Sequence, residues 1–206
     1  FKITNKTCLT MGLDSVEILV QVEKTFGIQY SDSEAESIST VQDFADKTAD
    51  KLYLPPSHNN IYLKVLEEFK NALVELGINK RLITENDFLK DIISPEKMKG
   101  IWLALEHKLN LKLPKLNKIN LIKKKYTGKI FNFYYVPGAM SILDINIKAL
   151  VDCIISINHM ELIDTKSIQS KYEIERIICG TISSMMGVPI HHIQLHHSIA
   201  NDLGVD

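Results

Sequence analysis

The hydrophobic residues of this chain recur mostly at the three- and four-residue spacing of an α-helix. Near the N-terminus this spacing predicts a helix from about Ser15 to Phe26. Its buried stripe is expected to comprise Val16, Leu19, Val20 and Phe26. Asp14 is expected to cap this helix, with Glu17 as the acid of a capping box, and Gly27 is expected to end it.

Two more elements are predicted before residue 55. A short acidic stretch from Asp32 to Ser37 leads to a second capping pattern, in which Thr40 is the N-cap and Asp43 follows three residues later. A helix is therefore expected to reach about Leu52. The prolines that follow, within residues 55–58, predict a boundary, because proline and the residue before it disfavour helix.

The middle of the chain begins with helical patterns. Apolar residues keep helical spacing from Tyr62 to Leu76, and Pro95 opens a second run to Leu109, in which Trp102 is expected to be a core residue. The pattern changes over residues 121–136, where aromatic and β-branched residues flank a Thr-Gly-Lys turn and indicate a β-hairpin.

Two further helices complete the pattern. The first is expected over Ile145 to Ile157 and the second over Tyr172 to Met186, with Gly187 as its end. The inward residues of the last helix are expected to be Ile174, Ile177, Ile178, Ile182 and Met185. The hydrophobic pattern as a whole predicts a mainly α-helical fold.

Composition agrees with a globular protein. The chain has 206 residues, 45% hydrophobic and 24% charged, and has neither a membrane-length apolar run of roughly 18 residues nor an N-terminal signal pattern. Residues 1–10 are interpreted as an extension. The cysteines Cys8, Cys153 and Cys179 lack metal-type spacing and are typical of a reducing compartment, so we expect a cytoplasmic protein without a membrane partner.

The net charge of −1 conceals a division along the chain. Residues 11–52 contain nine acidic residues and three lysines, a net charge of −6, and residues 172–206 have a net charge of −3. Residues 53–150 contain sixteen basic and nine acidic residues, a net charge of +7. Opposite charges on linked segments favour docking of one on the other and influence the choice of partner.

Two sequences at opposite ends of the chain resemble parts of one family. MGLDSVEILVQVEKTFGI, residues 11–28, is similar to the helix that carries the prosthetic group in acyl carrier proteins, and LHHSIANDLGVD, residues 195–206, resembles the loop that leads into that helix. The family has a first helix, a loop ending in D-L-G-x-D-S, a second helix, a short third helix and a fourth opened by T-x-x-D. The corresponding segments here are, in that order, Tyr172 to Met186, Ser198 to Asp206, Ser15 to Phe26, Asp32 to Ser37 and Thr40 to Leu52.

The resemblance implies a permuted fold. Residues 11–54 and 172–206 are expected to form an acyl-carrier-like four-helix bundle, and residues 57–170 a basic inserted region that is helical or α+β. The sequence given ends at Asp206, where the family places its modified serine. If Asp206 and Met11 meet within one molecule, the carrier is circularly permuted. If they do not, the C-terminal helix is expected to dock head-to-tail on the next molecule.

The resemblance also implies a modification. In the family a serine after the aspartate is esterified with 4′-phosphopantetheine by a phosphopantetheinyl transferase, and Ser15 is the candidate here. A phosphodiester in the first helical turn would meet free N–H groups and the positive end of the helix dipole. Asp14, Glu17 and Glu23 are the expected docking residues for acyl-transfer or synthase enzymes of fatty-acid or secondary-metabolite synthesis.

A second register leads to a different function. Eleven residues separate Ser15 from Phe26, and family members place their serine about one helical turn earlier. Aligning the apolar stripe puts Gly12 at the carrier position instead. On that register the protein is an unmodified, carrier-like scaffold that docks a biosynthetic enzyme.

The remaining candidate sites are weaker. The pairs His191-His192 and His196-His197, with His159 elsewhere, do not match a zinc motif, so no metal is predicted. Three lysines at residues 123–125, followed by aromatic residues, could contact nucleic acid, but exposure to solvent is the commoner outcome. No nucleophile elbow, phosphate-binding glycine loop or Cys–His pair indicates an enzyme.

Overall fold

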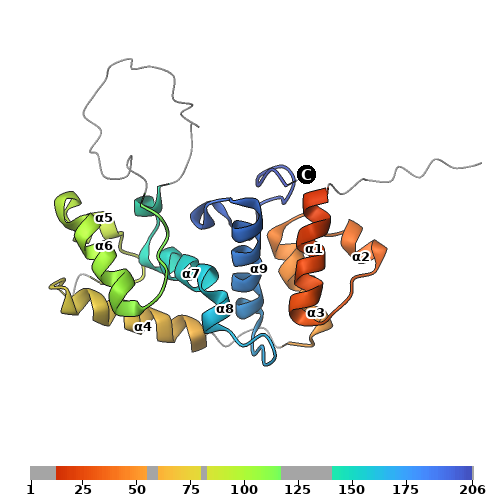
Figure 1. Ribbon diagram of the computed structural model, residues 1–206, viewed down its shortest axis with the longest axis horizontal. Coiled ribbons are helices and arrows are strands. Elements are labelled where there is room, and N and C mark those ends of the chain that lie inside the picture. The colour runs from red at the N-terminus through yellow and green to blue at the C-terminus, as the bar shows by residue number, and fades with distance from the viewer. Residues whose placement is uncertain (1–12, 55–59, 80–82, 117–140, 206) are drawn as a thin grey trace, which may run out of the picture.

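The computed structural model describes residues 13–54, 60–79, 83–116 and 141–205, and these residues are mainly α-helical (Figure 1). The prediction of a mainly α-helical fold is confirmed. The helices are α1 Leu13–Phe26, α2 Asp32–Glu36, α3 Val41–Lys51, α4 Asn60–Glu75, α5 Leu89–Ile92, α6 Pro95–Leu109, α7 Ile147–Ile157, α8 His159–Leu162 and α9 Lys171–Met186. Single 3-10 turns follow at Ile142–Asp144 (η3) and Ile190–His192 (η4).

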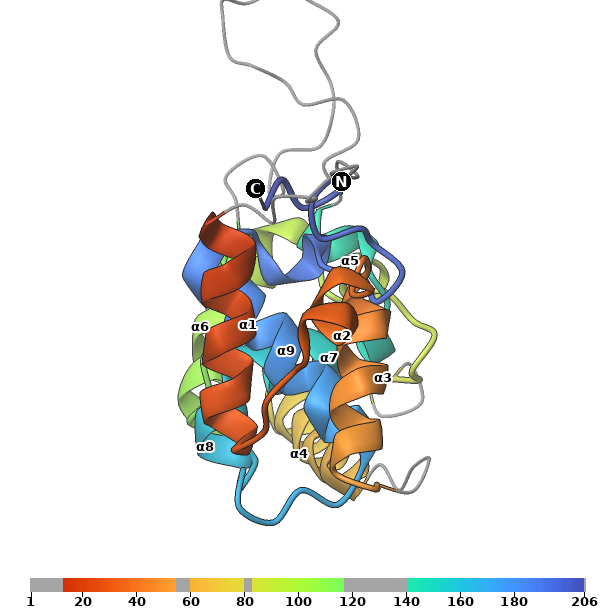
Figure 2. The same cartoon turned by 90° about the vertical axis from the view of Figure 1, so that its right-hand side faces the viewer.

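Helix α9 lies at the centre of the assembly (Figures 1 and 2). It packs against α1 and α3 on one side and against α7 and α8 on the other. Nine of the ten residues from Glu173 to Ile182 are buried. A helix that is buried all round must be apolar on every face, and the isoleucines predicted to point inward here, Ile174, Ile177, Ile178 and Ile182, are fully covered.

The predicted inward position of Met185 is wrong, because 37% of this residue is exposed. Met185 lies in the last turn of α9 and lines a surface groove together with residues of α1 and α8. The predicted burial of Trp102 is confirmed: it is 5% exposed and its indole N–H donates to the carbonyl of Pro114 at 3.0 Å.

The stripe predicted for α1 is also partly wrong. The residues of α1 that are buried are Ile18, Val22 and Phe26, whereas Val16 is 41% and Val20 36% exposed. Helix α1 therefore has two apolar stripes, and α9 covers the one that repeats every four residues. The helix also begins at Leu13, so Asp14 lies in the first turn instead of at the N-cap. An acidic residue there is still stabilised by the helix dipole.

Two backbone contacts of the same kind occur in distant parts of the chain. Thr40, the N-cap of α3, forms an isolated antiparallel bridge with Ser198, and Asn146, the N-cap of α7, forms one with Phe88. In each case the two N–H groups after the cap donate to carbonyls one and three residues before the bridge partner. The donors Val41 and Gln42 bind His197 and Leu195, and the donors Ile147 and Lys148 bind Asp87 and Glu85.

The ends of α1 and α6 show a second repeated contact. Glu23 accepts a hydrogen bond from the N–H of Tyr30, seven residues later, at 2.7 Å. Glu106 accepts one from the N–H of Leu113, also seven residues later, at 3.2 Å. In each helix the fourth residue after the glutamate has a left-handed backbone: Gly27 with φ of 65° and Asn110 with φ of 52°.

Helices α4 and α9 repeat a third feature. Each has 16 residues and is followed closely by a left-handed glycine, Gly77 or Gly187. Each glycine lies eleven residues before the bridge partner, Phe88 or Ser198. We define the first unit as α1, α2, α3, α9 and residues 187–205, and the second unit as α4, α5, α6 and α7. The two units share one plan of contacts, and the first uses its pieces in permuted chain order.

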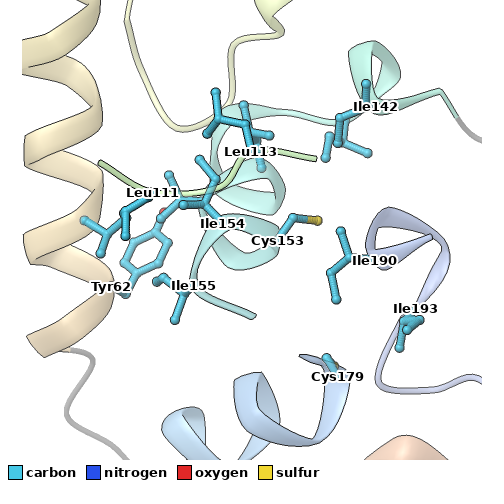
Figure 3. Close-up of a cluster of buried hydrophobic side chains, with 14 of the residues drawn as sticks. Tyr62, Leu111, Leu113, Ile142, Cys153, Ile154, Ile155, Cys179, Ile190 and Ile193 are labelled. Carbon is cyan, nitrogen blue, oxygen red and sulfur yellow. The ribbon is translucent and has the colours of Figure 1, made fainter. Parts of the chain in front are cut away.

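The buried side chains of the two units form one cluster. Figure 3 shows the part of it around α7, where side chains from α4, from the segment after α6, from α9 and from η4 meet. Its labelled members are Tyr62, Leu111, Leu113, Ile142, Cys153, Ile154, Ile155, Cys179, Ile190 and Ile193. The domain boundaries expected from the sequence, 11–54 plus 172–206 and 57–170, stay a prediction.

Some sequence predictions fall outside the described residues. They concern the extension at residues 1–10, the hairpin at 121–136, the lysines at 123–125 and the thiol of Cys8. The other two cysteines are buried as expected: desolvation raises the pKa of the Cys153 thiol to about 12 and that of Cys179 to about 11. No helix in the described part of the chain has the length and apolarity to cross a membrane.

Replacement of Gly180 by alanine is expected to destabilise the protein. A Cβ atom at this position of α9 would lie 2.1 Å from the carbonyl oxygen of Ser156 and 2.4 Å from Nδ1 of His159. Because backbone cannot easily move away, we expect a loss of about 1–3 kcal/mol in urea unfolding. The control is Gly100→Ala in exposed α6, where nothing lies within 4 Å; it should stabilise by up to about 1 kcal/mol. Equal effects of the two substitutions would contradict this close packing.

Candidate docking site

Ser15, the residue predicted for phosphopantetheine attachment, is the third residue of α1. It is half-buried, and its hydroxyl donates a hydrogen bond to the carbonyl oxygen of Val205 at 3.3 Å. Val205 itself is only 1% exposed. The two ends of the described chain therefore meet within one molecule, at the point where the resemblance predicted that a loop end and a helix start would come together.

The C-terminal segment, residues 195–205, is held by its own turn contacts and by the core. The N–H of Ser198 donates to Asp202 at 2.8 Å, and its hydroxyl accepts from the N–H of Asn201 at 3.2 Å. The N–H of Val205 donates to the carbonyl of Ile199 at 3.1 Å. Three apolar side chains of the segment are buried: Ile199, Leu203 and Val205. The segment is thus a folded loop that covers the beginning of α1.

The start of α3 fixes this segment in place. Ser39 accepts from the N–H of Ile199 at 3.0 Å, next to the bridge between Thr40 and Ser198. The predicted capping box is confirmed: Thr40 accepts from the N–H of Asp43 at 3.0 Å, and Asp43 accepts from the N–H of Thr40 at 2.9 Å. The hydroxyl of Ser39 also donates to Asp43 at 2.8 Å.

These hydrogen bonds change the pKa of Asp43. Partial burial alone would raise the pKa of this carboxyl, but the hydrogen bonds from Ser39 and Thr40 outweigh burial. The pKa therefore lies below its ordinary value of 3.8. The charged form of Asp43 is the form that holds the start of α3 together.

The exposed face of α1 combines apolar and acidic side chains. Leu13, Val16 and Val20 are 74%, 41% and 36% exposed, and Asp14 and Glu17 are exposed beside them. We call these five residues the α1 face. Glu23, the third predicted docking acid, is half-buried and binds the backbone of Tyr30. The structure therefore brings two of the three predicted docking acids together on one exposed surface.

The repeated contacts locate Ser15 relative to the second unit. Glu23 and Glu106 are equivalent, so the residue equivalent to Ser15, eight positions earlier, is Met98 in α6. Met98 is 1% exposed and belongs to the core. This position therefore points inward in the second unit and under the C-terminal segment in the first. Gly12, the alternative carrier position, lies outside the described residues.

Phosphopantetheine fits poorly on Ser15 as the structure places it. The oxygen that would be esterified is half-buried, and it uses its only proton to bind Val205. An ester oxygen has no proton to donate, so attachment would leave the buried carbonyl of Val205 without this donor. The group would also have to displace the segment that covers the start of α1.

The histidines are arranged as neighbouring pairs. The rings of His191 and His192 have centroids 4.4 Å apart, those of His196 and His197 are 4.8 Å apart, and Nδ1 of His159 lies 2.8 Å from the carbonyl oxygen of Ser156. Among the described residues, no group of three or more His, Cys, Asp or Glu side chains could hold a metal ion.

A buried charge between the units was missed by the sequence analysis. Arg176 in α9 is 9% exposed and lines a cavity of about 500 Å³ between α7, α9 and η4. Its Nη1 lies 3.9 Å from Asp152, which accepts from the hydroxyl of Tyr172 at 2.5 Å, and its Nε has no hydrogen-bond partner. The signal that could have revealed this group is an arginine within a run of isoleucines at buried helical positions.

One comparison with known proteins gives a partial match. A segment of 35 residues is 49% identical to an acyl carrier protein of Thermosynechococcus vestitus. The matched segment is 17% of this chain and 43% of that protein, so the chain spans less than half the length of the relative. No protein-family model and no solved structure matches the chain. Similarity to carrier proteins is therefore established for one part of the chain.

Asp43→Asn is expected to weaken the protein in a pH-dependent manner. The folded pKa of Asp43 is lowered, so its stabilising effect is present above the unfolded pKa of about 3.9 and is lost as pH falls through the folded pKa. We expect a loss of about 0.5–2 kcal/mol at pH 7 in urea unfolding, and a smaller difference from the unmodified protein at pH 3. Asp50→Asn, at an exposed position of the same helix, is the control. The same difference at both pH values would contradict the role given to the charged carboxyl.

Proposed function

We propose that this protein is a carrier-like docking protein that presents the α1 face to an acyl-transfer or synthase enzyme of fatty-acid or secondary-metabolite synthesis. The observation on which the proposal rests is the division of labour within α1: Leu13, Val16 and Val20 are exposed beside two acids, while Ser15 turns towards Val205. In this function the protein supplies a recognition surface and no catalysis of its own.

Physical chemistry supports a docking role for this face. Three exposed apolar side chains on one helix provide area that a partner can remove from water. Asp14 and Glu17 next to them would attract a basic partner and orient it. The partial similarity to an acyl carrier protein supports the choice of partner class, because such a partner would recognise a helix of this type.

Carriage of an acyl group on phosphopantetheine at Ser15 is the second candidate function. The observation that favours it is the position of Ser15 in the first turn of α1, where N–H groups are free to meet a phosphate. The half-buried, hydrogen-bonded hydroxyl favours the docking function instead.

Incubation with a broad-specificity phosphopantetheinyl transferase and coenzyme A separates the two functions. We expect the intact mass of the protein to stay unchanged, while an acyl carrier protein treated in parallel gains one phosphopantetheine. A mass gain in this protein that disappears in Ser15→Ala would establish carriage and refute the unmodified docking protein.

Docking on the α1 face can be tested by competition. We expect the protein to inhibit condensing or acyl-transfer enzymes of its own organism when these act on their acyl carrier protein, and Asp14→Lys/Glu17→Lys to abolish the inhibition. The matched control is Asp50→Lys/Glu67→Lys, which changes the same charge at exposed positions of α3 and α4. Inhibition that survives the change at Asp14 and Glu17 would show that the α1 face is not the docking surface.

A further inference from the structure

The second unit exposes a face with the opposite charge to the α1 face. Helix α6 is the counterpart of α1, because Glu106 and Asn110 repeat the contacts of Glu23 and Gly27. Its exposed side has one large apolar residue, Leu103, which is 58% exposed. The exposed basic residues around it are Lys97, Lys99, His107 and Lys108.

We call Leu103 and these basic residues the α6 face. Lys108 forms an ion pair with Glu75 of α4 at 2.6 Å, and Glu96 is an exposed acid in the first turn of α6, so the free positive charge comes mainly from Lys97 and Lys99. The α1 face has Asp14 and Glu17 at its beginning. Each face thus places two charges of one sign near the N-terminal end of its helix and an apolar residue further along.

The two faces belong to helices on the same side of the molecule. In Figure 1, α6 lies in the left half and α1 in the right half, with α7, α8 and α9 between them. In Figure 2, after a quarter turn, both helices lie on the left, which is the front of Figure 1. A second molecule turned by half a rotation and placed in front would therefore set its α6 opposite α1, and its α1 opposite α6.

We propose that two copies of this chain form a symmetric dimer in which the α1 face of each copy binds the α6 face of the other. Symmetry then gives two equivalent contacts, which close the assembly at two molecules. Each contact joins acidic to basic side chains around the exposed residues Leu13, Val16, Val20 and Leu103. The two contacts act together, because formation of one places the other pair of faces at high local concentration.

The charges make this association dependent on salt. Exposed ion pairs are weakened when dissolved ions screen them, so the dimer is expected to dissociate as ionic strength rises. The apolar residues keep part of the attraction, because their removal from water does not depend on screening. The dimer also covers the α1 face, so self-association and docking of a partner enzyme exclude each other.

A charge-swap experiment tests the dimer by light scattering over a concentration series at low salt. We expect the unmodified protein to have the mass of a dimer at the upper concentrations. Asp14→Lys/Glu17→Lys, which makes both faces basic, and Lys97→Glu/Lys99→Glu, which makes both acidic, should each remain monomeric. An equimolar mixture of these two variants should recover the dimer mass, because each basic face then meets an acidic one.

Two controls make the result specific to these faces. Lys64→Glu/Lys166→Glu and Asp50→Lys/Glu67→Lys change the same charges at exposed positions elsewhere, and both should remain dimeric. Circular dichroism confirms that each variant is folded, so that a monomer cannot be mistaken for an unfolded chain.

Three results would overturn the proposal. The first is a monomeric unmodified protein throughout the concentration series at low salt, and the second is a mixture of the two variants that stays monomeric. The third is a mass that keeps growing beyond a dimer, which indicates open head-to-tail association. No enzyme takes part in this measurement, so its failure leaves the docking function untouched, and failure of docking leaves the dimer untouched.

Discussion

The structure depends on the burial of α9 from every side. Four isoleucines of this helix are completely covered, and each contributes about 1.5–3 kcal/mol when it leaves water. The covering elements come from both units: α1 and α3 on one side, α7 and α8 on the other. Gly180 allows α9 to approach the carbonyl of Ser156 closely. Without α9 the first unit would lack its longest helix, and the second unit would expose one face of α7.

The shared plan of the two units is preserved by backbone contacts more than by side chains. Thr40 and Asn146 are different residues, yet each caps a helix and pairs with a loop in the same way. Gly27 and Asn110 both adopt a left-handed backbone, which these two residue types tolerate better than most. The plan therefore constrains only a few residue types, and the remaining surface is free to differ, as the acidic α1 face and the basic Lys97 and Lys99 show.

The sequence predicted local structure well, because local structure depends on neighbouring residues. The capping box of Thr40, the start of α6 at Pro95 and the end of α9 at Gly187 were found in this way. The buried side of α1 was mistaken, because two apolar stripes fit the same helical spacing and only packing against α9 selects between them. Ser15 could be named from its motif, whereas its contact with Val205 depends on a residue 190 positions away.

The repeated plan was invisible along the chain, because one unit presents its pieces in a different order. A search for internal repeats compares segments in sequence order, and here α9 and the loop after it follow the helices that they precede in the second unit. The equivalent residues became apparent only from hydrogen bonds that join distant positions, such as Thr40 with Ser198 and Asn146 with Phe88.

The bridge between Thr40 and Ser198 has a consequence for synthesis on the ribosome. Helices α1 and α3 emerge first, but the helix and loop that cover them emerge more than a hundred residues later. In the second unit the pieces appear in the order in which they pack, so that unit can assemble while translation continues. Meanwhile Val22, Phe26 and Phe44 have no cover from α9, so the nascent chain exposes a sticky surface, and a chaperone would be needed most during this interval.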